Sequence, residues 1–195
     1  MATIGMDSLF YSKITEGAGG VETYAVPKIL AKAIKADISI ELAEASLFAD
    51  DALAHAIKLF KSGKLVLEVE DIGVEAAADL TGATVDKNGV LIAAGEDDGC
   101  LVAIGFRALK PDNRYRMFWL YRVKFAVPST NLQTKGDSIQ FQTPKVEGTI
   151  MRRNKPDASG KHPWKSEVTE GDPGVAAVIA AWFTQVYEPS YNSTP

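Results

Sequence analysis

The chain has 195 residues, of which 46% are hydrophobic and 24% charged, and its formal net charge is −4. This length and apolar content suit one folded domain with a real core and exclude a disordered chain. We expect neither a membrane span nor a secretory signal, because no apolar run is long enough and the start lacks a basic region. One cysteine and two histidines, Cys100, His55 and His162, exclude an intrachain disulfide and the usual zinc clusters.

Charge is divided unevenly along the chain. Residues 1–100 carry eight Lys or Arg against seventeen Asp or Glu, whereas residues 101–155 carry eleven against three. Blocks of opposite sign can pair within the fold or between copies of the chain. A solvated mixed surface is the third interpretation.

The first part of the chain reads as strands around one ambiguous segment. Short strands flank GAGG at residues 17–20, which predicts a hairpin. Residues 34–44 and 64–70 alternate apolar and charged side chains, as half-buried strands do. Between them, residues 46–63 break the alternation. Leucine, isoleucine and phenylalanine recur there at helical spacing, so a short helix and a long protruding connection both fit.

The middle of the chain predicts a helix and further hairpins. Residues 74–82 read as a short helix that ends at its final glycine. Asn88-Gly89 and Asp98-Gly99 are turn signals for hairpins. Residues 101–109 and 114–127 then form a long antiparallel hairpin.

The strand at residues 114–127 has two different faces by alternation. The apolar face comprises Tyr115, Met117, Trp119, Tyr121, Val123, Phe125 and Val127. The other face carries the cations Arg116, Arg122 and Lys124, with Arg114 near the strand end. A nucleic-acid platform is disfavoured here, because the aromatic residues lie mostly on the parity opposite to the cations.

The last part of the chain predicts strands, a loop and a helix. Residues 138–144 and 145–153 read as two strands, and residues 152–173, rich in Pro and Gly, as one long loop. An amphipathic helix follows Pro173, with its apolar face formed by Val175, Val178, Ile179, Trp182, Phe183 and Val186.

Chemical motifs do not emerge from the sequence. It has no phosphate-binding loop, no nucleophile elbow and no HExxH metal motif. We therefore expect no enzyme activity, no cofactor and no metal site. The residues alone predict a mostly antiparallel β-domain with a short helix and a C-terminal helix, and segregated charge favours a structural or self-associating protein.

Five blocks of sequence carry a family resemblance. They are MATIGMDSLFYSKITEG, AIKADISIELAEASLFADD, LEVEDIGVEAAADLTGATVD, FRALKPDNRYRMFWLYRVKFAVPSTNLQTKGDSIQF and TIMRRNKPDASGKHPWKSEVTEGD. In their order and length they resemble the major tail proteins, or tail tube subunits, of long-tailed siphophages that infect Gram-positive bacteria. The resemblance covers residues 1–189 as one tail-tube domain and leaves residues 190–195 as a polar tail.

The resemblance implies a fold and an assembly. It implies a mainly β (α+β) fold with two packed antiparallel sheets, a flanking helix and a C-terminal helix. Six copies form a ring whose inner sheets join into a barrel, and stacked rings form a virion tube that conducts DNA into the host. The implied partners are the chain itself, the tail tip and the tail terminator, with assembly in the host cytoplasm.

The resemblance also implies a connection between two early strands that reaches the neighbouring ring, at the position of residues 46–63. Its candidate inter-ring contacts are Leu47, Phe48, Leu53, Ile57 and Phe60. A ring closes through head-to-tail contacts, so Arg116, Arg122 and Lys124 become candidates for charge pairing within a ring.

A channel for DNA is expected to repel phosphate rather than bind it. The acidic candidates for its lining are Asp37, Glu41, Glu68, Glu70 and Glu147. The alternative function is a monomeric β-sandwich module that binds a carbohydrate or another ligand through exposed aromatic side chains.

Overall fold

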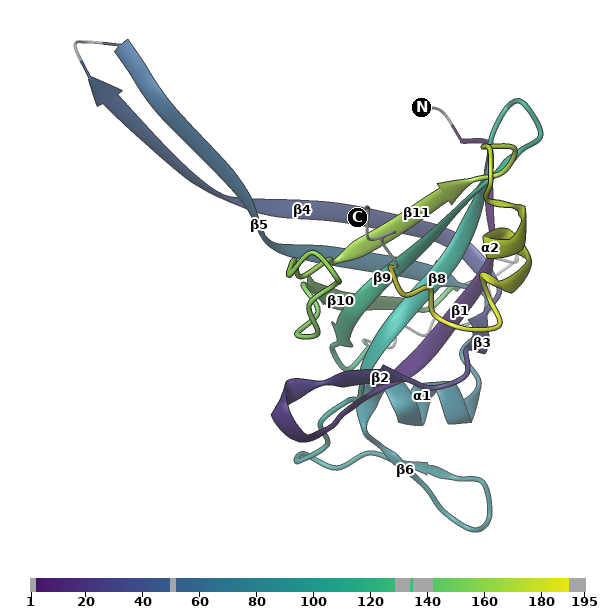
Figure 1. Ribbon diagram of the computed structural model, residues 1–195. Coiled ribbons are helices and arrows are strands. Elements are labelled where there is room, and N and C mark those ends of the chain that lie inside the picture. Colours follow the sequence, from purple (N-terminus) through teal and green to yellow (C-terminus); the bar gives the residue numbers. More distant parts are fainter. Residues whose placement is uncertain (1–2, 50–51, 129–133, 135–141, 190–195) are drawn as a thin grey trace.

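The computed structural model describes residues 3–49, 52–128, 134 and 142–189, which fold mainly into antiparallel strands (Figure 1). The strands are β1 Gly5–Glu16, β2 Glu22–Tyr24, β3 Lys28–Ala31, β4 Ala33–Ala49, β5 Ala52–Val69, β6 Thr84–Val85, β7 Leu91–Ile92, β8 Leu101–Leu109, β9 Tyr115–Phe125, β10 Lys145–Met151 and β11 Lys165–Thr169. The helices are α1 Val74–Thr81, α2 Ala176–Ala181 and the 3-10 turn Ala18–Gly20.

One large sheet organises the described residues. Its strands follow the order β2-β1-β8-β9-β10-β5-β4, with β3 paired to β1 and β11 paired to β9, while β6 and β7 form a small second sheet. The predicted mainly β class, with a helix at its flank and another near the C-terminus, is confirmed. The joining of sheets into a barrel between copies stays a prediction.

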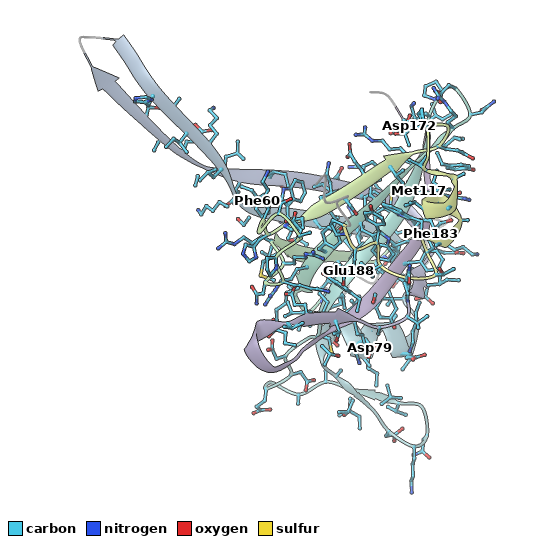
Figure 2. The ribbon with its side chains drawn as sticks, viewed as in Figure 1. Phe60, Asp79, Met117, Asp172, Phe183 and Glu188 are labelled. Atoms are coloured by element: carbon cyan, nitrogen blue, oxygen red, sulfur yellow. The ribbon has the colours of Figure 1, made fainter. Side chains whose placement is uncertain are left out.

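The central strands of the large sheet are covered on both faces. On one face, aliphatic side chains of β1, β5, β8, β9 and β10 form a cluster to which α1 contributes Ala76 and Leu80. On the other face, Met117 packs in a second cluster with Trp182 and Phe183 of the C-terminal segment (Figure 2). Burial on both faces explains why the middle of β8 is almost continuously apolar.

β9 changes the face that its side chains occupy part-way along its length. Residues 102–104 of β8 lie opposite residues 120–123 of β9, so β9 has one more residue than β8 in this interval. A bulge of this kind shifts the alternation by one position. Trp119 and Tyr121 therefore join the cluster near α2, whereas Val123 joins the cluster near α1. The prediction that all the apolar residues of this strand share one face is wrong beyond Tyr121.

Helix α1 ends as its sequence predicts. Gly82 follows Thr81 in the left-handed conformation, with φ of 83°, and its N–H donates to the carbonyl of Ala78 at 2.8 Å. Glycine adopts this conformation without steric cost, so it is the preferred residue at this position.

The segment that leads into β8 crosses closely over the end of α1. The N–H of Cys100 donates to the carbonyl of Asp79 at 3.1 Å. A Cβ atom added to Gly99 would lie 2.0 Å from the carbonyl oxygen of Leu80. The hairpin predicted at Asp98-Gly99 is wrong, because β7 does not pair with β8 and the glycine instead permits this crossing.

Two other predicted turns are confirmed. The 3-10 turn Ala18–Gly20 connects β1 with its antiparallel partner β2. Asn88 and Gly89 lie in the turn between β6 and β7, and Gly89 has a positive φ of 82°.

The segment 152–173, predicted as one long loop, contains the strand β11. β10 confirms the strand predicted after residue 144. Along β9, it pairs only with residues 122–125, and its other neighbour is β5. The first half of β9 is thus open to another strand, and β11 pairs with residues 116–120. The strand predicted at residues 138–144 lies largely outside the described residues.

Helix α2 is much shorter than the amphipathic helix predicted after Pro173. The carbonyl of Trp182 accepts a hydrogen bond from the indole Nε1 of Trp119 at 2.9 Å, and both the hydroxyl and the N–H of Thr184 donate to the carbonyl of Ala181. The N–H of Gln185 also donates to the carbonyl of Ala181, at 3.4 Å, so the chain beyond α2 continues in tight turns rather than as a regular helix. Trp182 and Val186 are nevertheless buried, as the apolar spacing predicted.

Candidate functional site

β4 and β5 extend beyond the rest of the sheet as a two-stranded arm (Figure 1). We define the arm as residues 42–49 and 52–60, which pair from Leu42–Phe60 to Ala49–Ala52. Of the two structures that fit residues 46–63, the helix is wrong and the protruding connection is correct. The antiparallel pairing of β4 with β5 continues from the body into the arm across a one-residue register shift, and this tertiary context outweighs the weak strand propensity of its many alanines.

The two faces of the arm differ in chemistry. Directly opposite residues of an antiparallel pair lie on the same face. One face, called here the apolar face of the arm, is formed by Ala43, Ala45, Ile57 and Leu59, with His55 following on the same side. The exposed fractions of Ile57 and Leu59 are 55% and 63%. The opposite face carries an ion pair between Glu44 and Lys58 at 3.0 Å. Exposed aliphatic side chains gathered on one side of a projecting element indicate an interaction surface.

The base of the arm is anchored to the body by an aromatic stack. Glu41 pairs with Ser62 and Leu42 with Phe60, so Lys61 is an extra, bulged residue where the arm leaves the body. The ring of Phe60 stacks on Trp164 with centroids 4.8 Å apart and planes 4° from parallel. Figure 2 shows Phe60 at this junction.

The five predicted inter-ring contacts therefore have different positions. Ile57 is exposed on the apolar face of the arm, whereas Phe60 is half-buried against its own chain. The backbones of Leu47, Phe48 and Leu53 belong to the paired strands of the arm, and their side chains lie outside the described part of the structure. Trp164, which positions Phe60, was not predicted, because nothing in the local sequence links these two residues.

The predicted cations of β9 all have acidic partners within the chain. Arg116 pairs with Glu167 of β11, and Lys124 pairs with Asp98 at 2.5 Å. Arg122 contacts Glu22, which is fully buried. It also lies 2.8 Å from Glu16. The basic block thus pairs with the acidic blocks inside the fold, which is one of the two pairings that the sequence allowed. Pairing between copies is untested.

Four of the predicted acidic residues lie on one exposed face. The outward residues of β4, β5 and β10 are in register there, so side chains of the three strands stand side by side. The fifth, Glu70, follows β5. Each carboxylate has a lysine partner: Asp37–Lys35 at 2.6 Å, Glu41–Lys61 at 3.7 Å, Glu68–Lys145 at 3.6 Å, Glu70–Lys32 at 2.8 Å and Glu147–Lys64 at 2.7 Å. We call this surface of β4, β5 and β10 the mosaic face.

The mosaic face is charge-balanced rather than acidic. A hydrogen bond from the hydroxyl of Thr143 and the nearby charge of Lys145 lower the pKa of Glu68, so this carboxylate stays ionised at neutral pH. Exposed ion pairs of this kind contribute little to stability, because water screens their attraction. Because the charges of each pair neutralise one another, this face exerts little net electrostatic force on a phosphate backbone.

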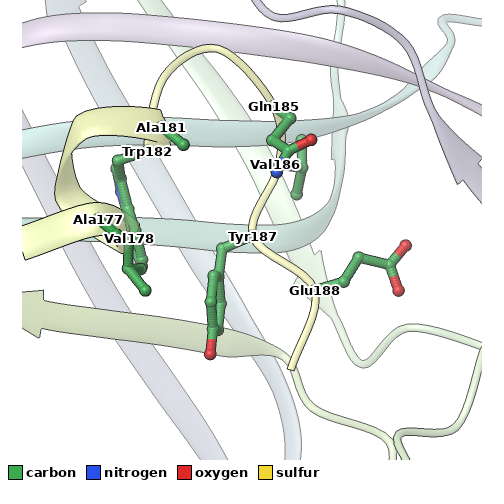
Figure 3. Close-up of a pocket in the computed structure, with 8 residues that line it drawn as sticks. All are labelled: Ala177, Val178, Ala181, Trp182, Gln185, Val186, Tyr187 and Glu188. Atoms are coloured by element: carbon green, nitrogen blue, oxygen red, sulfur yellow. The ribbon is translucent and has the colours of Figure 1, made fainter. Parts of the chain in front are cut away.

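A groove of about 380 Å³ lies along the C-terminal segment (Figure 3). Its lining residues are Ala177, Val178, Ala181, Trp182, Gln185, Val186, Tyr187 and Glu188. The carboxylate of Glu188 already accepts hydrogen bonds from Lys155 at 2.7 Å. Arg153 lies 3.5 Å from the same carboxylate. The groove therefore offers apolar contacts and one engaged carboxylate, with no arrangement that resembles a catalytic site.

Aromatic side chains are not gathered on the described surface. Each aromatic residue whose surroundings are described is buried or half-buried, including Trp164 and Tyr187. A carbohydrate platform of the kind expected for the alternative function is thus not present among these residues.

Comparison of the chain with protein-family models and with curated protein sequences finds no match. Neither helix in the described part of the chain is long and apolar enough to cross a membrane.

Proposed function

We propose that the chain is a structural subunit that self-assembles into stacked hexameric rings, forming the tail tube of a long-tailed bacteriophage. The observation that carries this proposal is the arm, a projecting hairpin whose apolar face has no cover from the described residues of its own chain. The resemblance of residues 1–189 to tail tube proteins implies a reaching connection at the same position.

The edge of the sheet supports the same function. β4 is the last strand in the sheet order and has no second partner strand among the described residues. An exposed edge of 17 residues is a template for pairing with another chain, and soluble monomers usually protect such edges. Pairing between copies would extend the sheet around a ring.

The mosaic face suits the lining of a channel. Its carboxylates and lysines neutralise one another, so the face has no excess positive charge that would bind the phosphates of a nucleic acid strongly. In the proposed tube, DNA passes through without specific binding. The tube belongs to the virion and ends at the tail tip and the tail terminator, and its subunits assemble in the host cytoplasm.

The test compares the parent chain with an arm variant, Ile57→Ser with Leu59→Ser, by negative-stain microscopy and sedimentation over rising concentration. We expect rings or tubes from the parent and at least a tenfold higher assembly threshold for the variant, because two exposed aliphatic contacts are lost. The matched control is Val85→Ser with Val90→Ser, exposed residues of the small sheet region. All three proteins should melt at similar temperatures.

The proposal fails if the parent stays monomeric at high concentration across salt and pH, even when tail tips are supplied as nuclei. The arm's role fails if the arm variant assembles as readily as the parent. The described surface has no exposed aromatic platform of the kind that would favour a monomeric carbohydrate-binding module.

A further inference from the structure

A second groove lies at the opposite end of β4 from the arm. Its volume is about 370 Å³, and it is lined by Asp7, Ser8, Leu9, Phe10, Ile29, Ala31, Lys32 and Ala33. These residues come from β1, β3, the start of β4 and Lys32 between β3 and β4. We call it the β3 groove. Its volume lies within the ~300–1,000 Å³ range of sites that bury ligand-sized apolar groups.

Irregular pairing of β1 creates this groove. β1 has one more residue than β8 between Asp7 and Phe10, and Ser8 in this bulge has a positive φ of 54°. The pairing of β1 with the short strand β3 also shifts at this point. Ala31 and Ala33 leave space beside the bulge, while Ile29, which is 71% exposed, forms part of the rim. Bulges of this kind often adjoin binding sites.

We propose that the β3 groove receives the apolar face of the arm from a second copy of the chain. This inference rests on the proposed function and names the surface on which the arm docks. Figure 1 shows the arm leaving one side of the body and β3 lying on the opposite side. Two complementary surfaces at opposite ends of a subunit produce a head-to-tail contact, which repeats along a stack.

The length of β4 sets the distance between the β3 groove and the apolar face of the arm within one subunit. Ala33 lines the groove and Ala45 lies on the apolar face of the arm, both in the same strand. Twelve residues separate them, so at ~3.3 Å per residue the two surfaces are at most about 40 Å apart. A second copy displaced by about that distance along β4 would bring its groove to the arm of the first.

The chemistry of the two surfaces agrees. The described part of the arm's apolar face carries no Lys, Arg, Asp or Glu, with His55 at its outer end, and the Glu44–Lys58 ion pair on its other face would remain in water after docking. In the groove, Asp7 and Lys32 already pair with Arg107 and Glu70 of their own chain. Docking would thus bury aliphatic groups without stranding a charge.

The other exposed apolar residues on a projection are a poorer acceptor. Val85, Val90, Leu91 and Ile92 surround the β6–β7 hairpin. Carboxylates of Asp86, Glu96 and Asp97 lie in the same segment with one lysine among them, whereas Asp98 pairs with Lys124. An apolar partner docked there would remove water from several like charges.

Crosslinking of single-cysteine variants tests the proposal. Cys100→Ser provides the background, and Ile57→Cys, on the arm, is mixed with an affinity-tagged chain carrying Ile29→Cys, at the rim of the groove. A matched acceptor control carries Leu91→Cys, on the β6–β7 hairpin. After assembly is confirmed by microscopy, the mixtures are oxidised with copper phenanthroline, and mixed dimers are quantified on non-reducing gels. Disulfides require Cα atoms within about 7 Å, so the readout is specific.

We expect at least tenfold more mixed dimer for the 57–29 combination than for the 57–91 combination. Equal yields, or a preference for position 91, in assembled samples would overturn the β3 groove while leaving the proposed function intact. Failure of the parent to assemble would instead overturn the proposed function and this inference with it. Leu59→Cys replaces Ile57→Cys if the latter raises the assembly threshold.

Discussion

The charged residues of this chain differ widely in how much they stabilise the fold, and the difference follows from how deeply each pair is buried. Glu22 is fully buried and Arg122 is 13% exposed, and the second carboxylate oxygen of Glu22 accepts the N–H of Asn154 at 3.0 Å. Lys124, two positions further along β9, pairs with a carboxylate that is largely in solvent. The first pair is held in a low-dielectric environment, where loss of one partner leaves an uncompensated charge.

Replacing Arg122 should therefore destabilise the folded chain. We expect Arg122→Ala to lower the free energy of unfolding by about 3 kcal/mol, and Lys124→Ala to lower it by less than about 1 kcal/mol. Urea denaturation of both variants measures the difference. Equal effects would show that the Arg122–Glu22 pair carries no special weight. Charge reversal at Lys124 is consequently the cleaner test of pairing between copies.

Tyr121 should make stability sensitive to alkaline pH. Burial disfavours its phenolate and raises its pKa to about 12, although Ser166 and Arg153 oppose this shift. A pKa raised above the unfolded value of about 10 stabilises the folded state below pH 10, and this contribution is lost as pH rises through 12. Its size is about 2–3 kcal/mol.

The measurement is the free energy of unfolding between pH 8 and 12 for the parent and Tyr121→Phe, with phenolate absorbance recorded alongside. We expect the variant to lose stability less steeply above pH 10, by about one proton in the slope. Identical slopes would mean that Tyr121 ionises in the folded state as readily as in the unfolded one.

At the scale of elements, alternation and capping predicted much of the fold, and non-local contacts account for the errors. The β8–β9 hairpin and the end of α1 at Gly82 follow from local sequence. The bulge near Tyr121 does not, because one inserted residue leaves the composition of the strand unchanged. Just after α2, the carbonyl of Trp182 accepts a hydrogen bond from Trp119, a residue of a distant strand. A local sequence pattern cannot reveal a hydrogen-bond partner that lies on a distant strand.

The sequence and the resemblance locate the candidate site at residues 46–63, but they do not decide its secondary structure. Residues 46–63 were placed as a reaching connection by resemblance, whereas the Ala-rich composition and the spacing of Leu53, Ile57 and Phe60 also suited a helix. The sequence also predicts that Phe60, like Ile57, contacts another copy. Its partner Trp164 lies in a segment expected to be a loop, so the stack could only be seen in three dimensions.

The crossing of the chain over α1 gives a sharp test at this scale. Gly99→Ala would place a methyl group against the carbonyl of Leu80, so we expect a loss of about 1–3 kcal/mol from overpacking. For a chain of this size about 2 kcal/mol corresponds to a melting temperature lower by ~4–8 °C. Gly95→Ala is the control, because a Cβ there meets nothing within 4 Å. Similar melting of both variants would contradict the tight crossing.

The whole molecule combines a body with buried clusters on both faces of its central strands and an arm whose described side chains beyond its base are exposed. A two-stranded hairpin is marginally stable without support, so the arm depends on the body at its base. Stability should therefore be graded along the molecule rather than uniform.

Hydrogen exchange should reveal this gradient. In the monomer, we expect amides of residues 42–49 and 52–60 to exchange well before those of β1, β8 and β9. Mass spectrometry of exchanged peptides measures the order, and assembly should slow exchange in the arm selectively. Protection of the arm equal to that of β9 in the monomer would contradict the dependence of the arm on its base.

The antiparallel pairing of the arm also determines how the molecule carries mechanical load. A pull along the arm stretches two covalent backbones together, while the hydrogen bonds between them run perpendicular to the force. The load then reaches the body through β5, whose six paired positions with β10 run from Glu68–Lys145 to Gly63–Ile150. These bonds would be loaded in shear and would have to break together, so the pairing of β5 with β10 resists tension applied to the arm.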